Sequence, residues 1–242
     1  KHAFNQNYRS THAVECPVID MNNKQTQVLP LKIPEHDHAT VIYYPLANRD
    51  HSLVALTMVT SHLLSPLFFQ EMRTEKQYGY LVGVGYVPIN RYPGIAFYIQ
   101  SPHTDAVTLT KAIDDFITES LSMLDEVGEQ NWHHLIHGLA GQLQEKDNNL
   151  RIKSQRFWAA ICNKDLLFTH KEQLVSAILT LKFSQVKSFI NNQLLAMSNP
   201  DRIILLSVPE DSTDLADQIK NELNGENISN HTDFTINNKR KF

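Results

Sequence analysis

Short apolar runs with the period of a strand and longer runs with the period of a helix follow one another along this chain. Residues 39–46 are β-branched and aromatic, which predicts a buried strand. Apolar residues alternate over 80–87, and residues 95–99 form a second apolar run after the loop 88–94, so the two runs predict a hairpin. Residues 202–208 predict the last strand.

Apolar residues at three- and four-residue steps predict the helices. The first covers about 53–72 and is largely buried, with Asp50 or Ser52 as its N-cap and with Pro66 kinking or restarting it. Strand, helix, hairpin, several helices and a final strand predict an α+β fold, in which an antiparallel-rich sheet packs against several helices. The further helices are predicted over 105–124, 126–147, a stretch with Phe157, Trp158 and Ile161, 172–181, 183–197 and a polar segment with Leu215, Ile219 and Leu223.

Three parts are predicted along the chain. Residues 1–37 are polar, contain three prolines and read as a connector with one strand, leading from a missing upstream domain. Residues 38–209 form a single α+β domain, and residues 210–242 form a polar helix and a disordered tail. Because the chain opens on Lys1 with an irregular polar stretch, we expect it to be a fragment of a longer protein.

Composition indicates a folded globular protein, with 42% hydrophobic and 20% charged residues. The formal net charge is -4 and the 22 Lys and Arg are scattered, so no nucleic-acid partner is expected. Apolar runs such as 203–208 are far shorter than the roughly 18 to 20 residues that span a bilayer, so no membrane insertion is expected. Cys16 and Cys162 match no metal or disulfide framework and could be free thiols or one bridge.

The most informative stretch runs from Ser65 to Tyr80. It ends an apolar helix with Arg73 and, after Gly79, begins a strand with Tyr80, so two hydrogen-bond donors lie seven residues apart across a helix-to-strand turn. We interpret Gln77 and Gly79 as turn residues, with Gly79 freeing the backbone between the helix and the strand.

This stretch resembles the last domain of the pitrilysin and insulinase (inverzincin) family of zinc metallopeptidases. The specific part is R-T-E-K-Q-Y-G-Y at 73–80, and the likeness covers about residues 24–208. It implies two clamshell halves of two homologous α+β domains each, which enclose peptides in a chamber, with zinc bound only in the first domain. This chain is similar to the fourth domain, so its partners would be the N-terminal half of the same protein and the peptide substrate. Supporting segments are Tyr43-Tyr44 before a helix, S-P-L-F at 65–68, I-Q-S at 99–101 and L-K-F-S-Q-V at 181–186.

The family's metal signature, H-x-x-E-H, is missing from this chain. The corresponding helix offers only His62. His133, His134 and His137 include an i, i+4 pair, and His36 and His38 could share one face of a strand, but neither group has a third ligand or a base at suitable spacing. We therefore expect no metal or other cofactor here, and expect the zinc of the parent enzyme in a domain that this chain lacks. No G-x-S-x-G context marks a nucleophile either.

The resemblance gives Arg73 and Tyr80 a catalytic role. In the family, the matching residues reach across the closed chamber and hydrogen-bond the substrate near its scissile peptide. A guanidinium offers fixed N–H donors, and a phenol stabilises an oxyanion, where losing one donor costs about 3 kcal/mol. The structural alternative is that Arg73 complements a helix C-terminus and Tyr80 merely begins a strand.

The sequence thus indicates the C-terminal domain of a zinc metalloendopeptidase that cuts oligopeptides or short polypeptides, inactive as a fragment. Resemblance to bacterial pitrilysin suggests the periplasm. One alternative is a non-catalytic binding or scaffold module, like a processing-peptidase subunit; an H-x-x-E-H motif upstream would separate the two. Another is an independent enzyme using the cluster of His133, His134 and His137, which stoichiometric zinc would support. Tyr86, Arg91 and Tyr92 on the hairpin receive no role, because the family varies there.

Overall fold

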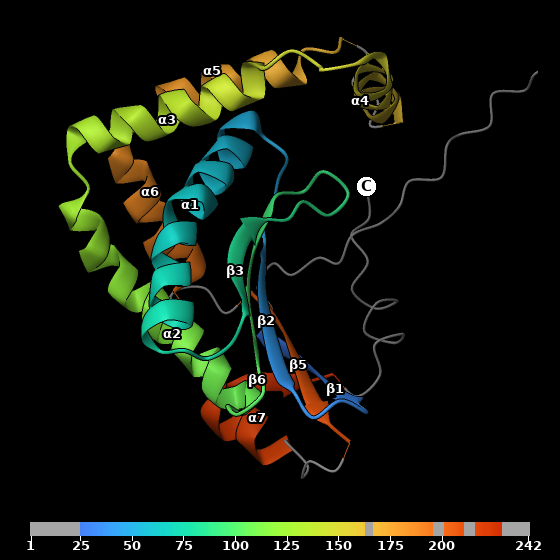
Figure 1. The fold of residues 1–242 in the computed structure, drawn as a ribbon, viewed down its shortest axis with the longest axis vertical. Helices are drawn as coiled ribbons and strands as arrows, with labels where there is room; N and C mark the ends of the chain where they lie inside the picture. Colours follow the sequence, from blue (N-terminus) through green and yellow to red (C-terminus); the bar gives the residue numbers. More distant parts are fainter. Residues whose placement is uncertain (1–24, 163–166, 196–200, 211–215, 229–242) are drawn as a thin grey trace, which may run out of the picture.

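The computed structural model describes residues 25–162, 167–195, 201–210 and 216–228. Cys16, most of the predicted connector and the end of the predicted tail lie outside these residues. The predicted fold class is confirmed: the described residues form a six-stranded mixed sheet with helices packed against it (Figure 1).

The sheet has the strand order β3-β4-β2-β5-β1-β6. β2 pairs antiparallel with β4 and β5, and β3 pairs antiparallel with β4, whereas β1 runs parallel to β5 and β6. The predicted hairpin is therefore confirmed, and it makes one edge of the sheet. The strands are β1 (Thr26–Ile33), β2 (His38–Pro45), β3 (Leu81–Tyr86), β4 (Gly94–Ser101), β5 (Ile203–Pro209) and β6 (Gly225–Asn227).

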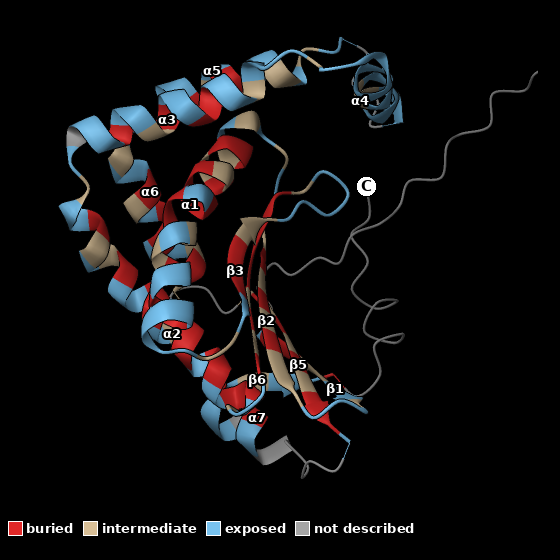
Figure 2. Cartoon of the chain, viewed as in Figure 1, coloured by how far each residue is buried: buried red, intermediate tan, exposed pale blue. Residues whose placement is uncertain are grey.

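Helices cover one face of the sheet, where most buried side chains lie (Figures 1 and 2). Phe68 of α1 packs edge-on against Phe97 of β4 and Phe116 of α2, with ring centroids 5.4 and 5.0 Å apart. The helices are α1 (His51–Phe69), α2 (Ala106–Met123), α3 (Glu129–Gln144), α4 (Leu150–Cys162), α5 (His170–Thr180), α6 (Phe183–Phe189) and α7 (Ala216–Glu222). The π turns are η1 (Gln70–Glu75) and η3 (Ile190–Leu194), and the 3₁₀ turn is η2 (Leu124–Glu126).

The helix predicted over 53–72 is α1 continued by η1, and Pro66 lies inside it without ending it. Asp50 is its N-cap residue, although no side-chain cap hydrogen bond forms there. By length and composition, His51–Glu75 could cross a membrane, the one such helix in the described part of the chain. Half of its apolar window is buried, however, as in the core helix of a folded domain.

A buried ion pair joins α2 to the sheet. Arg202, just before β5, has only 3% of its side chain exposed and binds Asp114 of α2 through both terminal guanidinium nitrogens. It also donates to the hydroxyl of Tyr44 on β2 at 3.3 Å. Burial opposes the charge of Arg202, but Tyr44 and Asp114 outweigh it, so the net effect raises the pKa of Arg202.

Three elements differ from the sequence prediction. The helix predicted over 126–147 begins only at Glu129, after the 3₁₀ turn. α4 carries the predicted aromatic residues but has no buried residue, and it is mostly exposed in Figure 2. β6 was not predicted, because Gly225–Asn227 is short and polar. The division at residues 37 and 209 stays a prediction, although β1 and β6 extend the sheet beyond both ends of the range 38–209.

Candidate active-site surface

A π turn carries Arg73 at the end of the long helix. η1 follows α1 directly and holds one residue more per turn than an α-helix would. Met72 is fully buried and anchors the turn in the core, whereas Arg73 points away from it and is exposed. Turns of this kind occur frequently at functional sites.

A buried carboxylate closes this turn. The amide of Lys76 donates to the carbonyl of Glu71 at 2.8 Å, and its Nζ donates to Oε1 of Glu71 at 2.5 Å. Burial works against the charge of Lys76, but the bond to Glu71 outweighs it and raises the pKa of Lys76. Oε2 of Glu71 is buried and has no hydrogen-bond partner among the described residues. Glu71 was not predicted as part of this turn, because its spacing of five residues from Lys76 fits a π turn and not an α-helix.

In the turn from helix to strand, the residue with the unusual backbone conformation is Gln77 and not Gly79. Gln77 has φ 51°, in the left-handed region, and the next amide, of Tyr78, donates to the carbonyl of Met72 at 3.0 Å. We expected Gly79 to free the backbone between the helix and the strand. This reason is wrong, because no described glycine has positive φ. Gly79 is needed for space instead: a Cβ there would lie 1.9 Å from the carbonyl oxygen of Gln100 on β4.

Arg73 and Tyr80 lie together on the surface. The guanidinium carbon of Arg73 is 5.6 Å from the ring centroid of Tyr80 and 4.8 Å from that of Phe69, so a cation sits between two aromatic rings. Tyr80 precedes β3 by one residue and is 88% exposed. Both donors therefore face outward from one point at the edge of the sheet.

Phe69 completes this cluster and was missed in the sequence, where Phe68 and Phe69 read as one apolar run. The signal was the four-residue step from Phe69 to Arg73, which places both on one face of a helix. Stacking restricts a long arginine side chain, so less conformational entropy is lost when its donors bind a ligand. Chemically, the cluster offers a held guanidinium and a phenol to an acceptor that approaches from solvent.

The histidines do not form a comparable site in the described part of the chain. His62 is exposed on α1, and the rings of His133 and His137 stack with centroids 6.3 Å apart on the surface of α3. No cluster of three or more metal-ligating side chains occurs among the described residues. A contact that spacing could not reveal joins His51 to His170, with Nε2 of the first 2.9 Å from Nδ1 of the second.

Comparison with known proteins shows which family the chain resembles. Residues 59–158 match the family model described as PQQ synthase PqqF-like, C-terminal lobe domain 4, and this range includes both Arg73 and Tyr80. The match confirms the resemblance to the C-terminal domain of the pitrilysin and insulinase family that the string at 73–80 indicated.

Particular relatives agree with this class. A nardilysin-like protein of Arabidopsis thaliana is 26% identical over 168 residues, which are 66% of this chain and 16% of that protein. Coenzyme PQQ synthesis protein F of Klebsiella pneumoniae is 35% identical over 96 residues, 40% of this chain and 12% of that protein. The chain thus spans under a fifth of the length of either protein. The matches support a peptidase-family module.

Solved structures show the same fold. The crystal structure of pitrilysin superposes with a TM-score of 0.71 at 18% identity, covering 82% of this chain and 21% of that one. An inactive domain of an M16 peptidase from Pseudomonas fluorescens superposes with a TM-score of 0.60 at 16% identity, covering 85% of this chain and 47% of that one.

Proposed function

We propose that this chain is the C-terminal, substrate-side domain of a zinc metalloendopeptidase that hydrolyses oligopeptides or short polypeptides. The observation that supports it best is the cluster of Phe69, Arg73 and Tyr80, in which two exposed donors are held together on a turn anchored by buried Met72 and Glu71. A purely structural arginine at a helix end does not require the π turn or an exposed tyrosine against its guanidinium.

In this proposal Arg73 and Tyr80 bind the peptide beside the bond that is cut. The zinc, held by a domain that this chain lacks, would supply an activated water. The guanidinium of Arg73 would orient a substrate carbonyl through its fixed N–H donors. The Tyr80 hydroxyl would donate to the oxygen on which negative charge develops, an interaction that is stronger in the transition state than in the bound substrate. The domain would also close the substrate chamber against the N-terminal half.

A non-catalytic module remains the second candidate. It is favoured by the likeness to the inactive domain of the M16 peptidase from Pseudomonas fluorescens. In such a protein the cluster would bind or hold a peptide segment without cleavage. We place the protein in the periplasm as part of the first proposal, on the resemblance to bacterial pitrilysin alone.

The test is mutation of the two donors in the longer protein that contains this chain. Arg73→Ala and Tyr80→Phe are each expected to lower kcat/KM by about 100-fold, the usual effect of losing one donor to a developing oxyanion. Zinc content, measured by mass spectrometry of the metal, is expected to stay unchanged. Arg151→Ala on exposed α4 and Tyr98→Phe on β4 serve as matched controls with near-normal turnover.

Three results would contradict the proposal. Loss of zinc in either variant would mean that the residues support the metal site and do not contact substrate. Unchanged kcat/KM in both variants, with turnover present in the parent protein, would leave only the structural role for them. Absence of turnover in a parent protein that binds peptide would favour the non-catalytic module.

A further inference from the structure

A cavity of about 750 Å³ lies at the far end of β3 from Tyr80. Its walls come from the start of α1, the hairpin loop after β3, the end of α3, one side of α4 and the start of α5. The cavity therefore joins segments far apart in sequence, and the contact of His51 with His170 closes part of its wall. We call it the basic cavity, for the reason that follows.

Its charged lining is of one sign. Four of the lining side chains are Arg49, Arg91, Arg156 and Lys171, and none of the described residues that line it is Asp or Glu. This is a local excess, because the whole chain has a formal net charge of -4. A concave surface lined by one sign of charge attracts ligands of the other sign.

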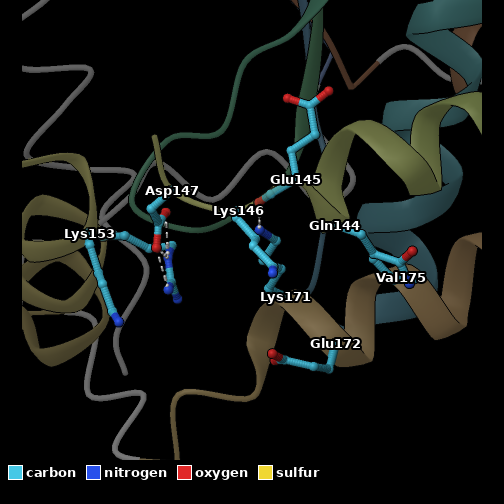
Figure 3. Close-up of a pocket in the computed structure, with 9 residues that line it drawn as sticks. Gln144, Glu145, Lys146, Asp147, Lys153, Lys171, Glu172 and Val175 are labelled. Carbon is cyan, nitrogen blue, oxygen red and sulfur yellow. Dashed lines mark hydrogen bonds and ion pairs between the residues drawn. The ribbon is translucent and has the colours of Figure 1, made fainter. Parts of the chain in front are cut away.

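Neighbouring groups hold three of these cations in place. Arg156 donates to Asp147 through Nε at 3.1 Å and through Nη2 at 2.7 Å, and Lys171 donates to the carbonyl oxygen of Glu145 at 2.7 Å. Both contacts are drawn in Figure 3, which views a second cavity of about 500 Å³ that shares Arg156 and Lys171 with the first. Arg49 lies over the ring of Tyr92, 4.6 Å from its centroid. Asp147 offsets the charge of Arg156, so the excess positive charge of the lining comes from the other three cations. The side chains of Arg49 and Lys171 are held before any ligand arrives, which lowers the entropy lost on binding.

The rest of the lining is largely apolar. Leu143 of α3, Leu174 of α5 and the two alanines of α4, Ala159 and Ala160, contribute side chains that a polar anion alone would not use. Phe168 also lines the cavity and packs edge-on against Phe157, with centroids 5.4 Å apart. The occupant that fits is therefore both negatively charged and apolar.

β3 connects this cavity to the Arg73 and Tyr80 cluster. Tyr80 precedes the strand, whereas Tyr86, its last residue, lines the cavity. The amide of Val87 donates to Gly94, so by antiparallel alternation the backbone groups of Val82, Val84 and Tyr86 point to the other side of β3. In the described part of the chain no strand pairs with that side. Six residues of strand span roughly 20 Å.

We propose that the basic cavity binds an acidic segment with an apolar side chain, carried by an extended peptide whose backbone pairs along the free edge of β3. The inference deepens the proposed function, since it takes the peptide bound at Arg73 and Tyr80 as the same molecule. It assigns Tyr86 and Arg91, on the hairpin that the sequence left without a role, to peptide selection.

Binding by the 242-residue chain tests this directly. The probes are three fluorescein-labelled ten-residue peptides, alanine-based and identical except for one tripeptide: Asp-Phe-Glu, Lys-Phe-Lys or Asp-Ser-Glu. Fluorescence anisotropy is expected to give a Kd for the Asp-Phe-Glu peptide at least tenfold lower than for either of the others. Equal affinity for the Lys-Phe-Lys peptide would overturn the charge argument, and equal affinity for the Asp-Ser-Glu peptide would overturn the apolar one.

Charge reversal locates the binding. Arg91→Glu and Lys171→Glu, from different walls of the cavity, are each expected to raise the Kd of the Asp-Phe-Glu peptide at least tenfold. Lys182→Glu before α6 makes the same change of net charge outside both cavities and is expected to stay within twofold. Circular dichroism checks that each variant folds, and two cavity variants keep the test decisive if one does not. If both folded cavity variants match Lys182→Glu, the inference is wrong.

The outcome is separable from that of the proposed function. Binding to the chain requires no turnover, so a selective, cavity-dependent affinity supports the inference even if Arg73→Ala leaves hydrolysis by the longer protein unchanged. Conversely, Arg73→Ala could lower kcat/KM while the chain shows no selectivity among the three peptides. That result would support the proposed function and contradict peptide binding in the basic cavity.

Discussion

Two glycines on either side of Tyr80, Gly79 and Gly85, show how differently a single position can depend on its surroundings. A Cβ on Gly79 would lie 1.9 Å from the carbonyl oxygen of Gln100, whereas a Cβ on Gly85 of β3 would meet nothing within 4 Å. Backbone cannot yield as the end of a flexible side chain can. The close approach of Gly79 to β4 therefore fixes where Tyr80 leaves the turn.

Gly79→Ala is expected to lower the free energy of unfolding by about 2 kcal/mol, because overpacking against backbone forces the turn to shift. Gly85→Ala is the matched control, and it is expected to be neutral or slightly stabilising, since alanine restricts the unfolded chain without a clash. Urea unfolding followed by circular dichroism measures both. Equal stabilities of the two variants would show that the turn gives way freely and does not fix Tyr80.

The sequence singled out Arg73 and Tyr80 correctly as neighbours, but it gave the wrong reason for the turn between them. Arg73 and Tyr80 were found because they stand in a dense string, and the structure places them in contact. Gln77 was read as a turn residue, but its positive φ was credited to Gly79. A left-handed glutamine is uncommon and depends on the hydrogen bond from Tyr78 to Met72, which local sequence does not show.

At the level of elements, the Arg202–Asp114 pair fixes α2 on the sheet. Arg202 is buried at the start of β5, and its countercharge comes from a helix 88 residues earlier. Tyr44 adds a hydroxyl, and burial raises the pKa of that phenol to about 12 while Arg202 lowers it, so it stays a neutral donor and acceptor at pH 7. A buried charge whose partner is removed is strongly destabilising.

Asp114→Asn is accordingly expected to destabilise the chain by about 3 kcal/mol, since Arg202 would stay charged and buried without a countercharge. Glu222→Gln is the control: it removes the partner of Lys111, also on α2, from an exposed pair whose loss costs under about 1 kcal/mol. Chemical denaturation compares the two. If Asp114→Asn destabilises no more than Glu222→Gln, the buried pair does not hold α2 in place.

Elements with strong periodicity were predicted well, and elements defined by distant partners were not. β2, the hairpin and α2 follow from apolar spacing alone, and Asp105 caps α2 through the amide of Thr108 as its position suggests. β6 exists only because β1 offers it an edge to pair with. α4 has an apolar pattern but no buried residue, so periodicity predicted the helix without showing how far it packs against the domain.

On the scale of the whole molecule, the apolar pattern and one dense motif predicted the class of fold, whereas the basic cavity depends on tertiary contacts. Arg49, Arg91, Arg156 and Lys171 stand apart in the sequence, and the even scatter of charge argued against any basic surface. Folding gathers these cations at one end of β3. A scattered composition therefore excludes a large basic face, but not a small basic cavity.

The chain on its own is expected to lack both bound zinc and peptidase activity. If it holds only the substrate-side residues, the purified 242-residue chain is expected to bind far less than one zinc per molecule and to cleave no peptide. Metal mass spectrometry after dialysis and a fluorogenic peptide assay measure the two properties. The expectation rests on two observations. The chain has no H-x-x-E-H string, and His133 and His137 are two exposed side chains that lie together on α3.

Turnover that a chelator abolishes would contradict this expectation and favour an independent enzyme. His133→Ala with His137→Ala then decides between the remaining sites: loss of zinc and turnover would place the metal on α3, whereas unchanged zinc would place it elsewhere in the chain. Arg73→Ala in the same assay separates the roles, because a residue that only contacts substrate lowers turnover without releasing metal. Substrate contacts and metal ligands on different domains require both domains to approach before any bond is cut, so adding the zinc-binding half to an inactive chain should restore hydrolysis.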